Sequence, residues 1–210
     1  MKLVIFGATG GTGRELLQQA LDKGHEVTAI VRRPAAITVT HPRLHVIAGD
    51  IMQSDSLISY LQQQDAVLSA LGTRSFKATF KPGTFYYQSA RNLVELMGKA
   101  RVSRLICVTS TGVLDKPIGP WLYLKLLKPL LKHFYEDMRQ MEQVIQSSRL
   151  NWTIIRPPRL SDGKRTGHYR VGSTGELPHA NSISRADVAD YILNQLETPT
   201  TWQKAIAVAY

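Results

Sequence analysis

Short apolar runs alternate with segments of helical periodicity along the chain. The runs are nearly continuous, which is typical of strands buried on both faces of a parallel sheet. They predict strands over Lys2–Phe6, Glu26–Val31, Leu44–Ala48, Ala66–Ala70, Leu105–Thr109, Trp152–Arg156 and Ala205–Val208, with a further short segment at Ser182–Ser184. Between them, apolar residues recur every three or four positions, which predicts amphipathic helices. These span Thr12–Lys23, Asp55–Gln63, Gln88–Lys99, Leu131–Ser147 and Arg185–Leu196.

The repeated order of strand and helix predicts an α/β fold with a doubly wound, mostly parallel sheet. The 210 residues fit a single domain, 1–210, and no linker, repeat or low-complexity tract divides them. Ser54 is the expected N-cap of the second helix. Substrate-side loops are expected around 74–86, 112–130 and 159–181; the last of these lacks any periodicity and is long for a loop.

Composition narrows the class of protein. Apolar residues make up 43% of the chain and charged residues 20%, which excludes a disordered, collagenous or coiled-coil protein. No apolar run approaches the roughly 18–20 residues that cross a bilayer, and the start of the chain runs directly into a glycine motif rather than through a secretory signal. Cys107 has no partner for an intrachain disulfide. We therefore expect a cytoplasmic protein.

The charge predicts an anionic partner. Lys and Arg exceed Asp and Glu by 26 to 16, and the basic residues are split evenly, with 13 before Ile106 and 13 after it. The chain has neither a basic tail nor a recognition-helix motif, so a nucleic-acid partner is disfavoured. Basic residues also gather in 66–93, which contains no acid, and in 156–175, where Asp162 is the one acid. This distribution favours a cleft for a small anionic molecule.

The strongest chemical signal is the segment Gly7-Ala8-Thr9-Gly10-Gly11-Thr12-Gly13 between the first strand and the first helix. Gly7 allows a tight turn, Gly10 lets the backbone approach a pyrophosphate, and Gly13 allows the helix to pack closely on the strand. The helix N-terminus then faces the anion. A dinucleotide is therefore predicted to contact the turn, with Thr9, Gly11 and Thr12 completing the site.

The end of the second strand indicates which dinucleotide binds. Proteins that prefer NAD usually carry an acidic residue there, which accepts a hydrogen bond from the ribose 2′-hydroxyl. Here Val31 is followed by Arg32 and Arg33. A guanidinium can bind a 2′-phosphate through two hydrogen bonds. The sequence therefore favours NADPH.

Further contacts follow from the topology, because ligands lie across the carboxyl ends of the strands of a doubly wound sheet. Asp50 follows the third strand, where it can accept a hydrogen bond from the adenine amino group, and Ile51 lies beside it. The other candidates that follow strands are Leu71, Gly72, Thr73, Arg74, Thr109 and Ser110.

Together these residues resemble the atypical short-chain dehydrogenase/reductases, which have an NAD(P)-binding Rossmann-like core, and most closely the biliverdin-IXβ reductase/flavin reductase branch. The resemblance covers essentially the whole chain. The matching segments are Gly7–Gly13, Gly49–Asp50, Leu71–Arg74, Ser89–Leu93, Val108–Ser110, Leu150–Pro158 and Ile183–Ala189.

The resemblance implies a monomeric reductase that passes hydride from NADPH to a flavin, such as FMN or riboflavin, or to a linear tetrapyrrole such as biliverdin. It implies that Ser110 lies nearest the nicotinamide and the substrate, and that Pro157 and Pro158 bound the nicotinamide pocket. Arg159 stands where the branch has His, and so becomes a candidate substrate contact. Trp121 is a candidate to stack on a flat ring.

Other chemistry stays open. Conventional short-chain dehydrogenases use Tyr-x-x-x-Lys, whereas this chain offers Tyr135 and Arg139, and Arg is not a conservative replacement for that Lys. An atypical dehydrogenase or epimerase acting on a carbonyl or a sugar nucleotide would need Tyr135 as the proton donor. A non-catalytic NADP-sensing regulator or assembly factor would need neither Tyr135 nor Arg139. Ser110 could itself only cap a turn. The histidines show no metal-ligand spacing, so no metal site is predicted.

Overall fold

The computed structural model describes residues 1–73, 83–114, 130–173 and 177–210. In this part of the chain the main sheet has the order β3-β2-β1-β4-β5-β6-β10-β8. All neighbours are parallel except β8, which runs antiparallel to β10. Its strands are β1 (Lys2–Phe6), β2 (Glu26–Val31), β3 (Leu44–Ala48), β4 (Ala66–Ser69), β5 (Arg104–Val108), β6 (Asn151–Arg156), β8 (Arg170–Gly172) and β10 (Lys204–Ala209). The predicted doubly wound sheet is confirmed.

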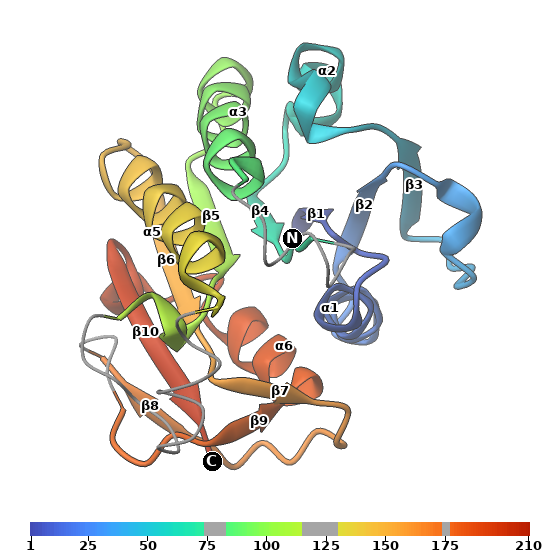
Figure 1. The fold of residues 1–210 in the computed structure, drawn as a ribbon. Helices are drawn as coiled ribbons and strands as arrows, with labels where there is room; N and C mark the ends of the chain where they lie inside the picture. The colour runs from blue at the N-terminus through green and yellow to red at the C-terminus, as the bar shows by residue number, and fades with distance from the viewer. Residues whose placement is uncertain (74–82, 115–129, 174–176) are drawn as a thin grey trace.

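Helices cover both faces of this sheet (Figure 1). One face carries α1 (Gly11–Asp22) and α6 (Arg185–Asn194), and the other carries α2 (Ile58–Leu61), α3 (Phe85–Ala100) and α5 (Lys132–Gln146). Alternate residues of β1 supply the two cores: Leu3 and Ile5 face α1 and α6, while Val4 and Phe6 face α3 and α5. Strand β1 is therefore apolar on both sides, which explains its nearly continuous apolar sequence.

Two elements begin where distant or unexpected residues cap them. Helix α3 begins at Phe85 rather than at the predicted Gln88, because the carboxylate of Asp137 on α5 accepts the amides of Tyr86 and Tyr87, both at 2.9 Å. The predicted helix Asp55–Gln63 is confirmed only in part. There the chain forms 3-10 turns over Ile51–Leu57 and then the short helix α2.

The cap of these turns is Asp50 and not Ser54. The carboxylate of Asp50 accepts the Met52 amide at 3.1 Å, so the turns begin before the position that the apolar periodicity indicated. The fold of this segment therefore follows from its local hydrogen bonds.

The stretch 159–181 contains strands that the sequence analysis did not predict. Strand β7 (Arg159–Ser161) pairs in parallel with β9 (Ser182–Ser184), and β8 adds an edge to the main sheet. Asp187 of α6 fastens the intervening chain, because its buried carboxylate accepts the amides of Thr166 and Gly167 at 2.8 and 2.9 Å. Short strands whose partners are distant leave little periodicity to detect.

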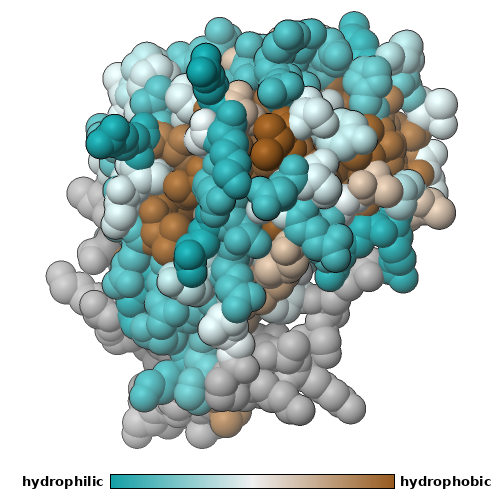
Figure 2. Space-filling view, turned by 90° about the horizontal axis from the view of Figure 1, so that it is seen from above, coloured by the Kyte–Doolittle hydropathy of each residue, from teal (hydrophilic) through white to brown (hydrophobic). Residues whose placement is uncertain are grey.

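Surface and core follow the expected division. Seen from above the view of Figure 1, polar side chains dominate and hydrophobic ones show in separate patches (Figure 2). Cys107 lies fully buried in β5, and burial raises the pKa of its thiol. Among the helices of the described ranges, none has both the length and the apolar character needed to cross a membrane.

Candidate functional site

A cavity of about 640 Å³ opens at the carboxyl ends of β1 and β4. These neighbouring strands connect onward in opposite directions, which makes their ends the switch point where doubly wound sheets bind ligands. The cavity brings together twelve of the residues proposed from sequence, namely Gly7, Thr9, Gly10, Gly11, Thr12, Arg32, Asp50, Ile51, Leu71, Gly72, Thr73 and Thr109.

The glycine turn forms one side of the cavity. Gly7 has a φ of +83°, and a Cβ there would collide with the carbonyl of Ala70. A Cβ at Gly13 would collide with the carbonyl of Gly7, so the absent side chain lets α1 pack directly on the turn. The Gly10 amide donates to the Gly7 carbonyl at 2.9 Å, and Gly10 is the N-cap of α1. This cradle leaves main-chain amides at the helix start for an anion.

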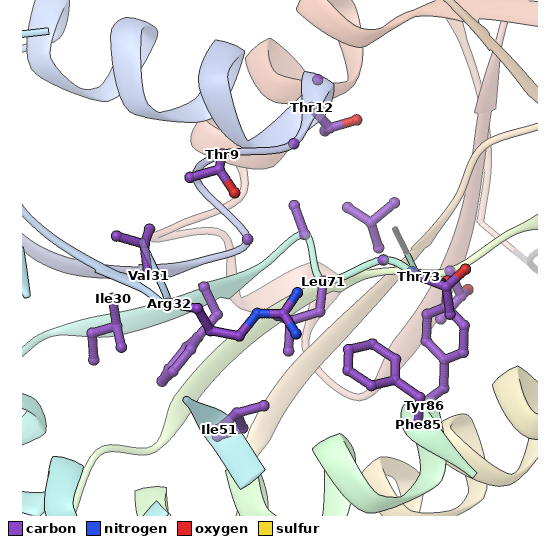
Figure 3. A pocket seen from close by; sticks show the side chains of 18 of the residues that line it. Thr9, Thr12, Ile30, Val31, Arg32, Ile51, Leu71, Thr73, Phe85 and Tyr86 are labelled. Carbon is purple, nitrogen blue, oxygen red and sulfur yellow. Dashed lines mark hydrogen bonds between the residues drawn. The ribbon is translucent and has the colours of Figure 1, made fainter. Parts of the chain in front are cut away.

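The end of β2 lies across from the turn. Arg32 lines the cavity, and its guanidinium extends from β2 toward Leu71 (Figure 3). Arg33 is placed differently from Arg32. It is exposed, it is the N-cap of the 3-10 turn Pro34–Ala36, and it is not among the residues that line the cavity. The structure therefore separates these two neighbours, with Arg32 alone beside the cavity.

The end of β5 is held by a buried ion pair. The Thr109 hydroxyl donates to Glu142 Oε1 at 2.6 Å, and Arg156 Nε donates to the same oxygen at 3.0 Å. The Glu142 side chain is almost fully buried, so this pairing satisfies a charge that burial would otherwise penalise. Thr109 lines the cavity, but its hydroxyl is committed to Glu142.

Ser110 caps the following turn. Its Oγ accepts the Gly112 amide at 3.1 Å, while the hydroxyl proton remains available for donation to another group. The Pro157 carbonyl accepts the Thr111 amide at 3.0 Å, which joins the ends of β5 and β6. Ser110, Pro157, Pro158 and Arg159 are not among the residues that line the cavity.

An aromatic wall, defined by Phe85, Tyr86 and Phe134, completes the cavity and was missed in the sequence. The rings of Phe85 and Tyr86, and those of Tyr86 and Phe134, meet edge to face with centroids 5.4 Å apart. The Tyr86 hydroxyl accepts the Thr73 amide at 3.3 Å, and burial raises the pKa of Tyr86. Phe134 lies in the predicted helix Leu131–Ser147, whereas Phe85 and Tyr86 precede the predicted helix start at Gln88. Helical periodicity does not tell which residues face a ligand.

Tyr135 is placed away from the cavity lining. Its ring lies so close to Gly112 that a Cβ there would collide with it, and it meets Phe134 edge to face. Arg139 donates to the Val113 carbonyl at 2.9 Å and pairs with Glu136. This pair of helix residues therefore packs against the turn that follows β5. Arg74 and Trp121 lie outside the described residues.

Arg185 also lines the cavity and was not proposed from sequence. It is the first residue of α6, and its side chain lies over Gly11 of the glycine turn. The spacing of the glycine motif gives no indication of this contact, because Arg185 and Gly11 meet only through the fold.

Comparison with known proteins shows the family to which the chain belongs. Residues 7–199 match a protein-family model described as NAD(P)H-binding. The chain belongs to this family. A nicotinamide dinucleotide fits the site because the turn is shaped by glycines, whose missing side chains leave the amides at the start of α1 accessible. The resemblance to atypical short-chain dehydrogenase/reductases is confirmed at the level of the Rossmann fold and of this NAD(P)H-binding family.

Three relatives illustrate the range of this NAD(P)H-binding family. The protein is 30% identical to the uncharacterized YwnB of Bacillus subtilis, over 95% of this chain and 93% of YwnB. It is 23% identical to the photosystem II assembly factor Ycf39 of Synechocystis, over 99% of this chain and 62% of Ycf39. The structure of ChuY, an anaerobillin reductase from Escherichia coli O157:H7, superposes with a TM-score of 0.81 and 26% identity, covering 100% of this chain and 97% of ChuY.

Proposed function

We propose that this protein is an NADPH-dependent reductase that transfers hydride to a flavin, such as FMN or riboflavin, or to a linear tetrapyrrole such as biliverdin. The observation that carries the proposal is that one cavity joins the glycine turn, Arg32 and the aromatic wall. The likeness to ChuY supports a conjugated acceptor.

The cofactor end of the site is assigned to the residues around the glycine turn. The amides that begin α1 bind the pyrophosphate, and the guanidinium of Arg32 binds the 2′-phosphate, which gives the preference for NADPH. Asp50 and Ile51 border the adenine. The other proposed cofactor contacts are Gly7, Thr9, Gly10, Gly11, Thr12, Gly13, Leu71, Gly72, Thr73, Arg74, Thr109 and Pro157, whereas Arg33 is left out because it does not line the cavity.

The acceptor end needs orientation more than acid–base groups. Bound NADPH supplies the hydride, and a flavin or tetrapyrrole takes it into a conjugated system. Water can then supply the accompanying proton, so the chain contributes proximity and exclusion of bulk water. We place the acceptor against the aromatic wall, with the Ser110 hydroxyl as a hydrogen-bond donor. The other proposed acceptor contacts are Trp121, Pro158 and Arg159.

A second candidate function is a non-catalytic, NADP-sensing assembly factor. The likeness to Ycf39 favours it, as does the engagement of the Ser110 Oγ in capping a turn. A carbonyl-acting dehydrogenase or epimerase has less support, because Tyr135 packs on Gly112 rather than lining the cavity. A cytoplasmic location, a monomeric state and substrate-side loops remain predictions from the sequence.

The deciding experiment separates binding from turnover. Purified protein is titrated with NADPH and NADH by calorimetry, and NADPH oxidation is then followed by absorbance with FMN, riboflavin and biliverdin. The reductase predicts tighter binding of NADPH than of NADH, and oxidation of NADPH with at least one acceptor. Binding of NADPH without oxidation in the presence of any acceptor would replace the reductase by the sensing function.

A further inference from the structure

The Arg185 side chain occupies the space directly above Gly11. A Cβ on Gly11 would lie 2.5 Å from Arg185 Cδ and 2.6 Å from its Nε, and the three nearest atoms all belong to Arg185. Gly11 is not among the glycines with positive φ, so its backbone conformation is open to other residues. A side chain at this position would therefore have to displace the flexible end of Arg185.

The guanidinium of Arg185 reaches Asp162, which follows β7. Arg185 Nη1 and Asp162 Oδ1 are 2.5 Å apart, and the Asp162 side chain is 89% exposed. Exposed ion pairs contribute little to stability, because water solvates both charges almost as well. The pair therefore holds the guanidinium beside the glycine turn without binding it tightly.

We propose that Arg185 is a ligand of the dinucleotide pyrophosphate, and that Asp162 holds its guanidinium when the dinucleotide is absent. This inference rests on the dinucleotide-binding part of the proposed function and is independent of the acceptor. The amides that begin α1 supply hydrogen-bond donors but only a partial positive charge. Arg185 adds a full charge beside Gly11, in a planar group that can donate two hydrogen bonds to phosphate oxygens.

Binding would then exchange one anion for another. The guanidinium leaves the Asp162 carboxylate and engages the pyrophosphate, so Asp162 competes with the ligand for Arg185. A structural ion pair predicts that loss of either partner weakens the site. Competition predicts opposite effects: loss of Arg185 weakens the binding of a pyrophosphate, whereas loss of the Asp162 charge strengthens it.

ADP-ribose is the probe for this test, because it carries the pyrophosphate but neither a 2′-phosphate nor a nicotinamide. Calorimetry on the full chain should show about tenfold weaker binding of ADP-ribose to Arg185→Ala. Asp162→Asn should bind ADP-ribose about threefold more tightly. In the double variant the gain should disappear, because it acts through Arg185. Arg165→Ala is the matched control: Arg165 is likewise an arginine paired with an acid, Asp190, and its loss should leave binding unchanged.

Several outcomes would overturn the proposal. Unchanged binding of ADP-ribose by Arg185→Ala would do so, as would weaker binding by Asp162→Asn, or a gain from Asp162→Asn that persists in the double variant. Thermal unfolding without ligand reports whether Arg185→Ala folds. If it does not fold, ADP-ribose binding is measured instead for the two single variants Arg185→Lys and Asp162→Asn. Wild-type protein that binds no dinucleotide would overturn this inference together with the binding site. Binding of ADP-ribose without reduction of any acceptor would overturn the reductase alone.

Discussion

The two ends of the cavity are built by different means. At the cofactor end, glycines and main-chain amides of one short segment, 7–13, create the cradle. At the acceptor end, the groups that hold the cavity walls are charged side chains from distant parts of the chain. Glu142 holds Thr109 and Arg156, while Asp137 caps the helix that carries Tyr86. The cofactor end therefore depends on one local segment, whereas the acceptor end depends on contacts between residues far apart in the sequence.

The largest effect on binding and stability is expected at the cofactor end, from Gly13→Ala. The new methyl group would meet the backbone of Gly7, which cannot move without distorting the turn. We expect loss of measurable ADP-ribose binding and about 4 kcal/mol of unfolding free energy. Calorimetry and urea denaturation measure the two effects.

Gly98→Ala is the matched control for this change. Gly98 lies in α3, and an added Cβ there meets nothing within 4 Å. This variant should gain about 0.5–1 kcal/mol of stability, because alanine favours the helix. Equal losses in both variants would show that the turn has no special need for glycine at position 13.

At the acceptor end, Glu142→Ala should cost about 3 kcal/mol of unfolding free energy, because it leaves Arg156 without its buried partner. Binding of ADP-ribose should stay within about threefold of wild type if the two ends are independent. Glu136→Ala removes an exposed pair on the same helix and should change stability by less than about 0.5 kcal/mol. A tenfold loss of ADP-ribose affinity in Glu142→Ala would contradict the separation of the two ends.

Asp187 anchors the segment between β7 and β9, and its contribution should depend on pH. Burial alone would raise the pKa of Asp187, but hydrogen bonds from Tyr210, Gly167 and Thr166 outweigh burial and hold it below its ordinary value of 3.8. A carboxyl with a lowered pKa stabilises the fold above its unfolded pKa, and this stability is lost as the pH falls through the folded value.

Asp187→Asn should therefore lower the unfolding free energy by about 2 kcal/mol at pH 7. The difference from wild type should shrink below about pH 4, as Asp187 of the wild type becomes protonated. Urea denaturation across this range checks both points, with Asp162→Asn, an exposed carboxylate, as the control. A difference that stays constant down to pH 2 would mean that the Asp187 charge contributes nothing.

The smallest effect is expected from Arg32→Ala, which should weaken NADPH binding about tenfold and leave NADH binding unchanged. Arg33→Ala is its neighbouring control and should affect neither cofactor, since Arg33 lies outside the cavity lining. Equal losses for NADPH and NADH in Arg32→Ala would show that Arg32 does not contact the 2′-phosphate.

The sequence predicted the features that neighbouring residues encode. The order of the main parallel strands follows from buried apolar runs. The predicted bounds of β1, β2 and β3 match the structure, and those of β4, β5, β6 and β10 differ by one residue at one or both ends. The glycine turn belongs to the same class, because its requirements arise within one strand, one turn and one helix.

The sequence analysis missed what depends on contacts between distant residues. The start of α3 is set by Asp137, which lies some fifty residues further along the chain. The placement of Arg185 over Gly11 requires α1 and α6 to lie side by side. Strands β7 and β8 are too short to show alternation, and the two-stranded pairing of β7 becomes visible only once β9 is in place. The periodicity of one sequence segment gives no information about such pairings with distant segments.

Because Cys107 is buried, the reactivity of its thiol depends on how often the fold opens. A protonated sulfur enclosed between the two layers of helices resists alkylating reagents and peroxide while the sheet stays closed. Since the chain contains one cysteine, any modification of a thiol must come from molecules in which β5 has separated from its neighbours. The rate of labelling thus counts opening events in the centre of the fold, and a bound dinucleotide should slow it in proportion to its affinity.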